Sequence, residues 1–185
     1  MRIIGGRFKG RRFNPPANKW PTRPTTDFAK EGLFNILANR FDFADIKMLD
    51  IFGGTGNHSY EAISRGCMQV TYVDQHRPCV KYVEQIAEKL GIGTELHIKH
   101  TDAARFIANV IDEYDYIFAG PPYGLTWLEQ IPDLIFNADM LREGGLLVLE
   151  HNQAHSFTRH RHFEQMRKYG GSLFSFFTVN QSIAE

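Results

Sequence analysis

Cysteine is scarce in this chain of 185 residues, which contains Cys67 and Cys79 and no C-x-x-C pair. A disulfide framework or a zinc site is therefore an unfavourable interpretation. No apolar run is long enough to span a bilayer, and residues 1–6 do not have the pattern of a signal peptide. We therefore expect a cytoplasmic protein that holds no metal and does not enter a membrane.

Net charge is also absent, because 21 basic residues balance 21 acidic ones, but the two signs are unevenly distributed. Residues 1–30 hold eight basic residues and one acid, a charge of +7, and the remainder carries −7. A basic arm on a mildly acidic body is typical of binding to a polyanion through phosphate contacts, whereas a solvated hairpin is the simpler alternative. The candidate phosphate-binding side chains are Arg2, Arg7, Lys9, Arg11, Arg12 and Lys19.

The length favours one domain over residues 1–185, with enough chain for a sizeable core. Residues 1–24 predict a short β-hairpin, formed by residues 2–13, and an exposed loop that contains four prolines. We expect the core to occupy residues 25–179 and a frayed tail to occupy residues 180–185.

The core alternates between short apolar runs and amphipathic segments, which predicts a parallel sheet with helices on both faces. The expected strands are 46–51, 69–74, 94–99, 114–119 and 145–150. The expected helices are 57–65, 77–90, 102–111 and 127–136, with an earlier one that begins near Thr25, Thr26 and Asp27. The end of the core differs, because 162–169 and 172–179 flank two glycines and predict an antiparallel hairpin.

A glycine-rich turn follows the first of these strands and fits the D-x-F-x-G-x-G pattern of a loop that binds S-adenosylmethionine (SAM). Glycines suit such a loop because side chains would block the approach of the backbone to a ligand. The turn is neither a phosphate-binding G-x-x-x-x-G-K-[ST] loop nor a dinucleotide G-x-G-x-x-G loop, which argues against an oxidoreductase. The candidate cofactor residues here are Asp50, Phe52, Gly53, Gly54, Thr55 and Gly56.

Chemically useful residues also follow the next three strands, and the carboxyl ends of parallel strands meet at one edge of a sheet. Asp74, with Gln75 beside it, lies where an acid can accept hydrogen bonds from ribose, and Asp102 with Ala103 could meet an adenine edge. Residues 121–123, Pro-Pro-Tyr, end the fourth strand. Each acid alone is more often a helix N-cap, but their register on consecutive strands favours one ligand site.

The sequence resembles the RsmD-type methyltransferases of small-subunit (16S) ribosomal RNA over nearly the whole chain, and three segments carry the resemblance. They are the opening residues 1–10, the signature at 23–27 with its helix at 33–37, and the helix segment 61–66. The resemblance implies a seven-stranded, Rossmann-like methyltransferase sheet and transfer of methyl from SAM to the N2 amine of a guanine. It also implies that Arg23, Thr25 and Thr26 help to close the cofactor site. The expected partner is small-subunit rRNA or an assembled particle, bound by a monomer.

The catalytic tetrapeptide departs from the family pattern Asp/Asn-Pro-Pro-Tyr/Phe, because it reads Gly120, Pro121, Pro122 and Tyr123. In such motifs a side-chain oxygen and the carbonyl of the first proline hold the target amine, and the aromatic ring stacks on an everted base. Gly120 supplies no side-chain oxygen, so slow turnover with retained SAM binding is expected. An engineered change, a naturally altered member and an acid from elsewhere are all open explanations, although Asp115 lies at the wrong end of its strand. Gly53, where the family has a small side chain, is expected to be a mild change.

Two further groups of residues and two rival functions remain open. His151, His155, His160 and His162 match no metal-ligand spacing and favour a solvated or RNA-facing segment. His58 and His76 are expected at the rim of the cofactor site, and Glu150 is expected to be structural. The rival functions are an inactive RNA-binding assembly factor and an N6-adenine or other amino-methyltransferase acting on nucleic acid.

Overall fold

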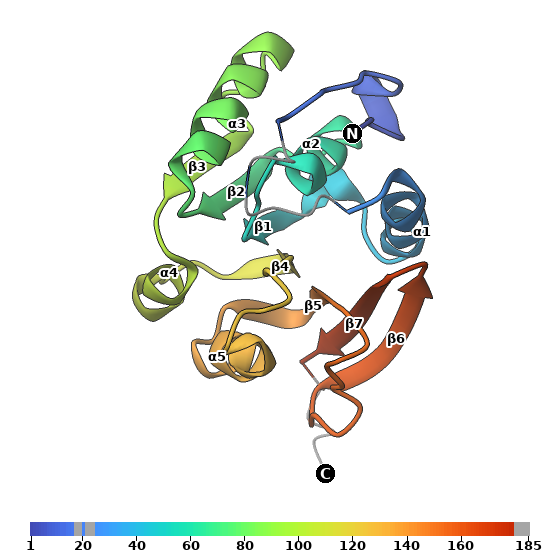
Figure 1. Cartoon of the computed structure of the whole chain (residues 1–185), viewed down its shortest axis with the longest axis vertical. Helices are drawn as coiled ribbons and strands as arrows, with labels where there is room; N and C mark the ends of the chain where they lie inside the picture. Colours follow the sequence, from blue (N-terminus) through green and yellow to red (C-terminus); the bar gives the residue numbers. More distant parts are fainter. Residues whose placement is uncertain (17–19, 21–24, 180–185) are drawn as a thin grey trace.

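The protein folds around a seven-stranded sheet in the order β3-β2-β1-β4-β5-β7-β6 (Figure 1). The structure is a computed structural model that describes residues 1–16, 20 and 25–179. Five strands are parallel, and the last two run antiparallel to their neighbours. The strands are β1 Lys47–Ile51, β2 Gln69–Asp74, β3 Leu96–His100, β4 Tyr114–Ala119, β5 Leu141–His151, β6 Phe163–Tyr169 and β7 Ser172–Thr178.

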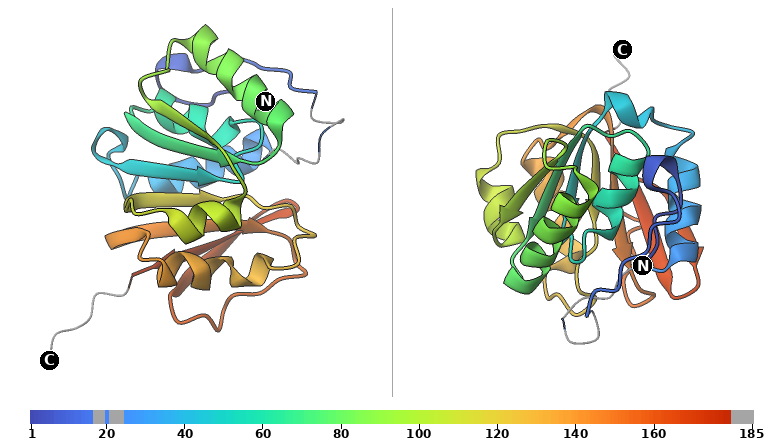
Figure 2. Two further views of the ribbon diagram at one scale, coloured as in Figure 1. Left: turned by 90° about the vertical axis from the view of Figure 1, so that its left-hand side faces the viewer. Right: turned by 90° about the horizontal axis from the view of Figure 1, so that it is seen from above.

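Helices cover both faces of the sheet, which the views in Figure 2 show from two further directions. The first three helices pack on one face, and α4 and α5 pack on the other. The α-helices are α1 Asp27–Leu37, α2 Asn57–Ser64, α3 Arg77–Leu90, α4 Ala103–Asn109 and α5 Ile131–Asn137. The short 3-10 helices are η1 Gly6–Phe8, η3 Phe43–Asp45 and η4 Leu128–Gln130.

Alternation along the central strands divides the core into two layers. In β4, Tyr116 and Phe118 pack with α1 to α3, whereas Ile117 and Ala119 pack with α4 and α5. Successive side chains of a strand point to opposite faces, so a strand that is apolar at every position must be covered on both sides. The near-continuous apolar run of this strand therefore predicts its central place in the sheet.

The register of the parallel strands places their carboxyl ends at one edge of the sheet. Ile51 lies opposite both Val73 and Ala119, and Asp74 lies opposite His100. The residues that follow these strands therefore leave the sheet side by side, as the sequence predicts, and this edge carries the candidate site.

Two predicted boundaries are wrong for identifiable reasons. The strand expected over 145–150 begins four residues earlier, because Gly144 adopts φ +74° and a register shift in the pairing with β4 keeps 141–151 in one strand. The helix expected over 127–136 divides into η4 and α5. Pro132 lies in the first turn of α5, where its missing N–H costs no helical hydrogen bond.

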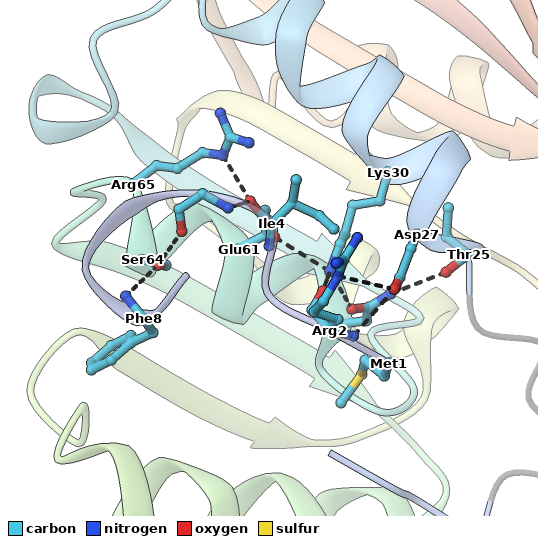
Figure 3. A network of polar contacts seen from close by, with 12 residues as sticks. Met1, Arg2, Ile4, Phe8, Thr25, Asp27, Lys30, Glu61, Ser64 and Arg65 are labelled. Carbon is cyan, nitrogen blue, oxygen red and sulfur yellow. Dashed lines mark hydrogen bonds and ion pairs between the residues drawn. The ribbon is translucent and has the colours of Figure 1, made fainter. Parts of the chain in front are cut away.

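The segment expected to be an N-terminal hairpin closes through one antiparallel bridge, between Arg2 and Arg12, and its tip is the helix η1. Backbone hydrogen bonds also join the two arms of the segment, from Ile3 to Arg11, from Gly10 to Ile3 and from Phe13 to Met1. Other N–H groups of the segment bind α2 (Figure 3). Ile4 and Gly5 donate their N–H groups to the Glu61 carboxylate at 2.8 Å each, and Phe8 donates to Ser64. The basic arm is therefore held against the core by buried polar groups.

Among the described residues, none of the helices has the length and apolarity needed to cross a membrane.

Candidate active site

A cavity of about 660 Å³ opens at the carboxyl edge of the sheet and brings most of the predicted site residues together. Its wall is formed by the segment before α1 and by residues that follow β1, β2, β3 and β4. The predicted residues that line it are Thr25, Asp50, Phe52, Gly53, Gly54, Thr55, Asp74, Gln75, Asp102, Ala103, Gly120, Pro121, Pro122 and Tyr123.

Two predicted cofactor residues lie outside this wall, and two predicted residues fall outside the described chain. Thr26 is the N-cap of α1, where its side chain accepts from the Ala29 N–H. Gly56 is the N-cap of α2 at φ +76°, and a Cβ there would come within 2.6 Å of the Tyr60 ring. Both therefore shape the elements next to the cavity. Lys19 and Arg23 lie outside the described residues.

The turn after β1 has a backbone that few side chains allow. Phe52 and Gly54 both have positive φ, at 64° and 52°, and Gly54 donates its N–H to Asp74 at 2.8 Å. A Cβ on Gly53 would lie 2.4 Å from the ring of Tyr72, whose hydroxyl donates to the Gly54 carbonyl. Glycine at position 53 is therefore matched to a tyrosine on the neighbouring strand, and a larger residue here would have to displace the Tyr72 ring.

Asp50 lies fully buried at the end of β1 and caps the helix that follows. Its Oδ2 accepts from the Ser59 N–H at 3.1 Å and from the Ser59 hydroxyl at 2.6 Å. Burial raises the pKa of Asp50 to about 7, although the two bonds from Ser59 oppose the shift. This carboxyl group therefore exchanges its proton near neutral pH.

The two other strand-end acids are held by backbone N–H groups. Asp74 accepts from Gly54 with one oxygen and from His76 with the other, at 2.8 and 2.7 Å. Asp102 caps α4 by accepting from the Arg105 N–H at 3.0 Å. Both serve as caps or turn anchors, and both also line the cavity. The capping and ligand-site interpretations are thus compatible.

The tetrapeptide at 120–123 leaves β4 at the opposite wall of the cavity. The Gly120 N–H donates to the Ile51 carbonyl at 3.3 Å, which continues the sheet by one bond. The Tyr123 hydroxyl donates to Glu150 at 3.2 Å, and His155 contacts the Tyr123 carbonyl at 3.3 Å. Tyr123 is half-buried, and these contacts hold it at both its side-chain hydroxyl and its backbone carbonyl.

Sequence reasoning missed several residues of the wall, of which Glu150 is chemically the most important. It was expected to be structural, but it lines the cavity. Like Asp50 and Asp74, it lies at the carboxyl end of a strand, and this position was the signal that could have identified it. His58 and His76, which were expected at the rim of the cofactor site, both line the cavity, and His58 is buried. It stacks on Phe118 at 3.8 Å between ring centroids, bonds Tyr116, and has a pKa that burial lowers well below the usual value. The other missed wall residues are Trp20, Asn57, Val73, Phe118, Leu125 and Trp127.

Two residues of the basic arm are paired with acids. Arg2 contacts Asp27 at 3.5 Å, and Arg7 contacts Glu95 at 2.6 Å. The other described members of the predicted set, Lys9, Arg11 and Arg12, are exposed. These three side chains are therefore the best placed for phosphate contacts.

The histidine-rich segment has mixed environments. His151 is fully buried and bonds Ser175 at 2.8 Å, which corrects the expectation of a wholly solvated segment. His155 and His160 contact Glu129 and Asp133, and the ring of His162 stacks on that of Phe136. Within the part of the chain that the structure describes, no group of three His, Cys, Asp or Glu residues could hold a metal ion.

Comparison with known proteins identifies relatives along most of the chain. The family described as "Conserved hypothetical protein 95" matches residues 1–178. YlbH of Bacillus subtilis is 34% identical over 156 residues, which cover 83% of each chain. Ribosomal RNA small subunit methyltransferase D of Escherichia coli K12 is 30% identical over 150 residues, covering 81% of this chain and 74% of that protein. The solved structure of yhhF from Escherichia coli superposes with a TM-score of 0.82 at 26% identity and covers 96% of both chains.

Proposed function

Because the chain belongs to the RsmD family of SAM-dependent RNA methyltransferases, described as "Conserved hypothetical protein 95", we propose that it methylates the N2 amine of a guanine in small-subunit rRNA. The observation that carries the proposal is the single cavity shared by the glycine-rich turn, Asp74, Asp102 and the tetrapeptide 120–123. One cavity that is lined by both the glycine-rich turn and the tetrapeptide can bring a methyl donor and a base amine together.

The residues of the turn fit a SAM molecule. A side chain at position 53 would collide with the Tyr72 ring, so glycine keeps this turn close to β2, and Phe52, Gly53, Gly54 and Thr55 line the cavity. Asp74 and Asp102 would hold the polar parts of the donor, and Val73, Leu125 and Trp127 would exclude water from it. SAM, when bound, supplies an electrophilic methyl group.

The tetrapeptide would hold the base. The Tyr123 ring offers a face on which an everted purine can stack, and the Pro121 carbonyl can accept a hydrogen bond from the base amine. Such a bond holds the nitrogen lone pair toward the donor, which lowers the barrier by positioning. Lys9, Arg11 and Arg12, which are exposed on the N-terminal segment, would bind RNA phosphates.

The experiment is a radiolabelled-SAM assay on unmethylated small ribosomal subunits and on naked small-subunit rRNA, followed by mass mapping of the nucleosides. We expect label in N2-methylguanosine. Label in N6-methyladenosine or another nucleoside would replace the proposed target base, and the comparison of the two RNA samples separates an assembled particle from free RNA as substrate.

An RNA-binding assembly factor that has lost the reaction is the second candidate, favoured by the glycine at position 120. Tight and salt-sensitive binding to small subunits, together with methyl incorporation no higher than a no-enzyme background, would favour this candidate over the enzyme.

A further inference from the structure

Glu150 lies beside the position where the tetrapeptide lacks its side-chain oxygen. Ala119 at the end of β4 pairs with Leu149 in β5, so Gly120 and Glu150 are the next two neighbours along the parallel pair. Phe118 and Val148 pack in the same core layer, and alternate residues of a strand share a face. The Glu150 side chain therefore extends from the same face of the sheet as a side chain at position 120 would.

Three hydroxyl groups hold the Glu150 carboxylate at the cavity wall. Oε2 accepts from Thr25 at 2.5 Å, and Oε1 accepts from Ser172 at 2.8 Å and from Tyr123 at 3.2 Å. The side chain is almost completely buried, at 5% exposure, yet it lines the cavity. It thus connects the segment before α1 with the tyrosine on which the base would stack.

The other acids near the cavity are poorly placed for this role. Asp50 accepts from Ser59 in α2, and Asp74 accepts from Gly54 in the turn that would hold the donor. Asp115 accepts from the Lys47 N–H and from Arg142 near the start of β4, away from the carboxyl edge of the sheet. Glu150 is the carboxylate that adjoins both Gly120 and Tyr123.

We infer that Glu150 is a catalytic residue that accepts a hydrogen bond from the guanine amine in place of the missing side chain at position 120. This inference rests on the proposed function. The amine lone pair forms the new N–CH₃ bond while the S–CH₃ bond breaks, its electron pair stays on sulfur, and one amine proton leaves to water. Glu150 would hold the other N–H and keep the lone pair directed at the methyl group.

The first test compares the wild-type protein with Glu150→Gln, which keeps the shape and one carbonyl oxygen for the Ser172 and Tyr123 hydroxyls. Its NH2 group can donate to Thr25 but cannot accept a hydrogen bond from the guanine amine. With unmethylated small subunits we expect kcat to fall about a hundredfold, because one preorganised charged group is lost, and the SAM dissociation constant by calorimetry to change less than about threefold. Asp115→Asn, at the other end of β4, is the matched control and should retain wild-type kcat. An unchanged kcat in Glu150→Gln would overturn the inference.

The second test restores an acid at the family position. A Cβ on Gly120 would lie 3.2 Å from the Phe118 ring, so a side chain there requires only a small shift. Gly120→Asp in the Glu150→Gln background should recover at least tenfold in kcat, whereas Gly120→Ala, with the same Cβ contact and no oxygen, should not. Equal recovery by both variants, or no recovery by aspartate, would assign Glu150 to structural support alone.

A third readout does not depend on methyl transfer. Guanosine and inosine monophosphate differ only in the 2-amino group, and ligand-detected NMR can compare their affinities for the protein without SAM. We expect the wild type to prefer the guanosine nucleotide and Glu150→Gln to lose that preference, and equal preferences in both proteins would overturn the inference. If no RNA is methylated, the proposed function fails, and this measurement still tests base recognition.

Discussion

Gly53 shows how one missing side chain can depend on a residue in another strand. A Cβ at this position would overlap Tyr72, which is fully buried and cannot move without leaving its hydrogen bond to Gly54. Gly53→Ala should therefore lower the free energy of unfolding by about 1–3 kcal/mol and weaken SAM binding. Urea unfolding and calorimetry measure the two effects.

The double variant Gly53→Ala with Tyr72→Leu should cost less than the sum of the single changes, because the smaller side chain removes the overlap. Gly93→Ala is the control, since its Cβ would meet nothing within 4 Å and its φ is not positive. A Gly53→Ala protein as stable as Gly93→Ala would contradict the packing argument.

Asp50 gives a prediction for pH. Its pKa of about 7 in the folded protein exceeds the value of 3.8 expected when unfolded, so the folded state binds the proton more tightly. The resulting stabilisation is complete below about pH 4 and disappears as pH rises through 7, a change of at most about 4 kcal/mol at 1.36 kcal/mol per pKa unit. Urea unfolding at pH 5 and pH 8 should show a smaller fall in stability for Asp50→Asn than for the wild type.

Asp139→Asn controls for the loss of one carboxylate. Asp139 is exposed at φ +49°, a conformation that asparagine also adopts, so this variant should retain the wild-type fall between pH 5 and pH 8. Parallel pH curves for Asp50→Asn and the wild type would show that the buried carboxyl group does not titrate in this range.

At the scale of elements, a buried lysine joins the N-terminal segment to α1 and α2 (Figure 3). Lys30 is 1% exposed and its Nζ contacts the Arg2 carbonyl at 2.6 Å, Asn57 at 2.7 Å and Glu61 at 3.3 Å. Burial lowers the pKa of Lys30, and the Glu61 carboxylate opposes that shift. The network therefore anchors the N-terminal segment to the core, in addition to the backbone hydrogen bonds within the segment.

Lys30→Met should lower the free energy of unfolding by about 3–5 kcal/mol, because it leaves buried acceptors without their cation. Hydrogen exchange at the Ile4 and Gly5 amides should quicken, since Glu61 loses a group that holds it in place. Lys81→Met on the exposed side of α3 is the control and should stay within about 0.5 kcal/mol of the wild type. If Lys30→Met left the hydrogen exchange of these two amides unchanged, the Lys30 network would not be what anchors the arm.

The strands and helices could be predicted because their signals are local. The bounds of β2, α3 and β4 agree with the sequence prediction at both ends, since apolar runs mark the strands, and Pro78 and the C-cap Gly91 mark the ends of α3. The start of β5 could not be predicted, because its glycines form a bulge only when paired with β4. The role of Lys30 depends on Arg2, Asn57 and Glu61, which lie at least 27 positions away, so no local pattern reveals it.

At the scale of the whole molecule, the folded chain reduces the charge asymmetry that the sequence displays. Arg2 and Arg7 are paired with acids, and Lys30 is buried, so the exposed charge of the described arm is concentrated at Lys9, Arg11 and Arg12. The first 16 residues therefore combine an inner part that anchors and an outer part that can meet RNA.

Replacing Lys9, Arg11 and Arg12 together by alanine tests the proposed RNA-binding surface. Each lost phosphate contact lowers the slope of log K against log salt by about 0.7–0.9, so three contacts should lower it by about 2. The affinity for unmethylated small subunits, measured at several salt concentrations, gives the slope. Alanine at Lys89, Arg105 and Lys168, which are exposed on α3, α4 and β6, removes the same charge and should leave the slope unchanged. Equal slopes for the two triple variants would mean that net charge, and not the arm, attracts the RNA.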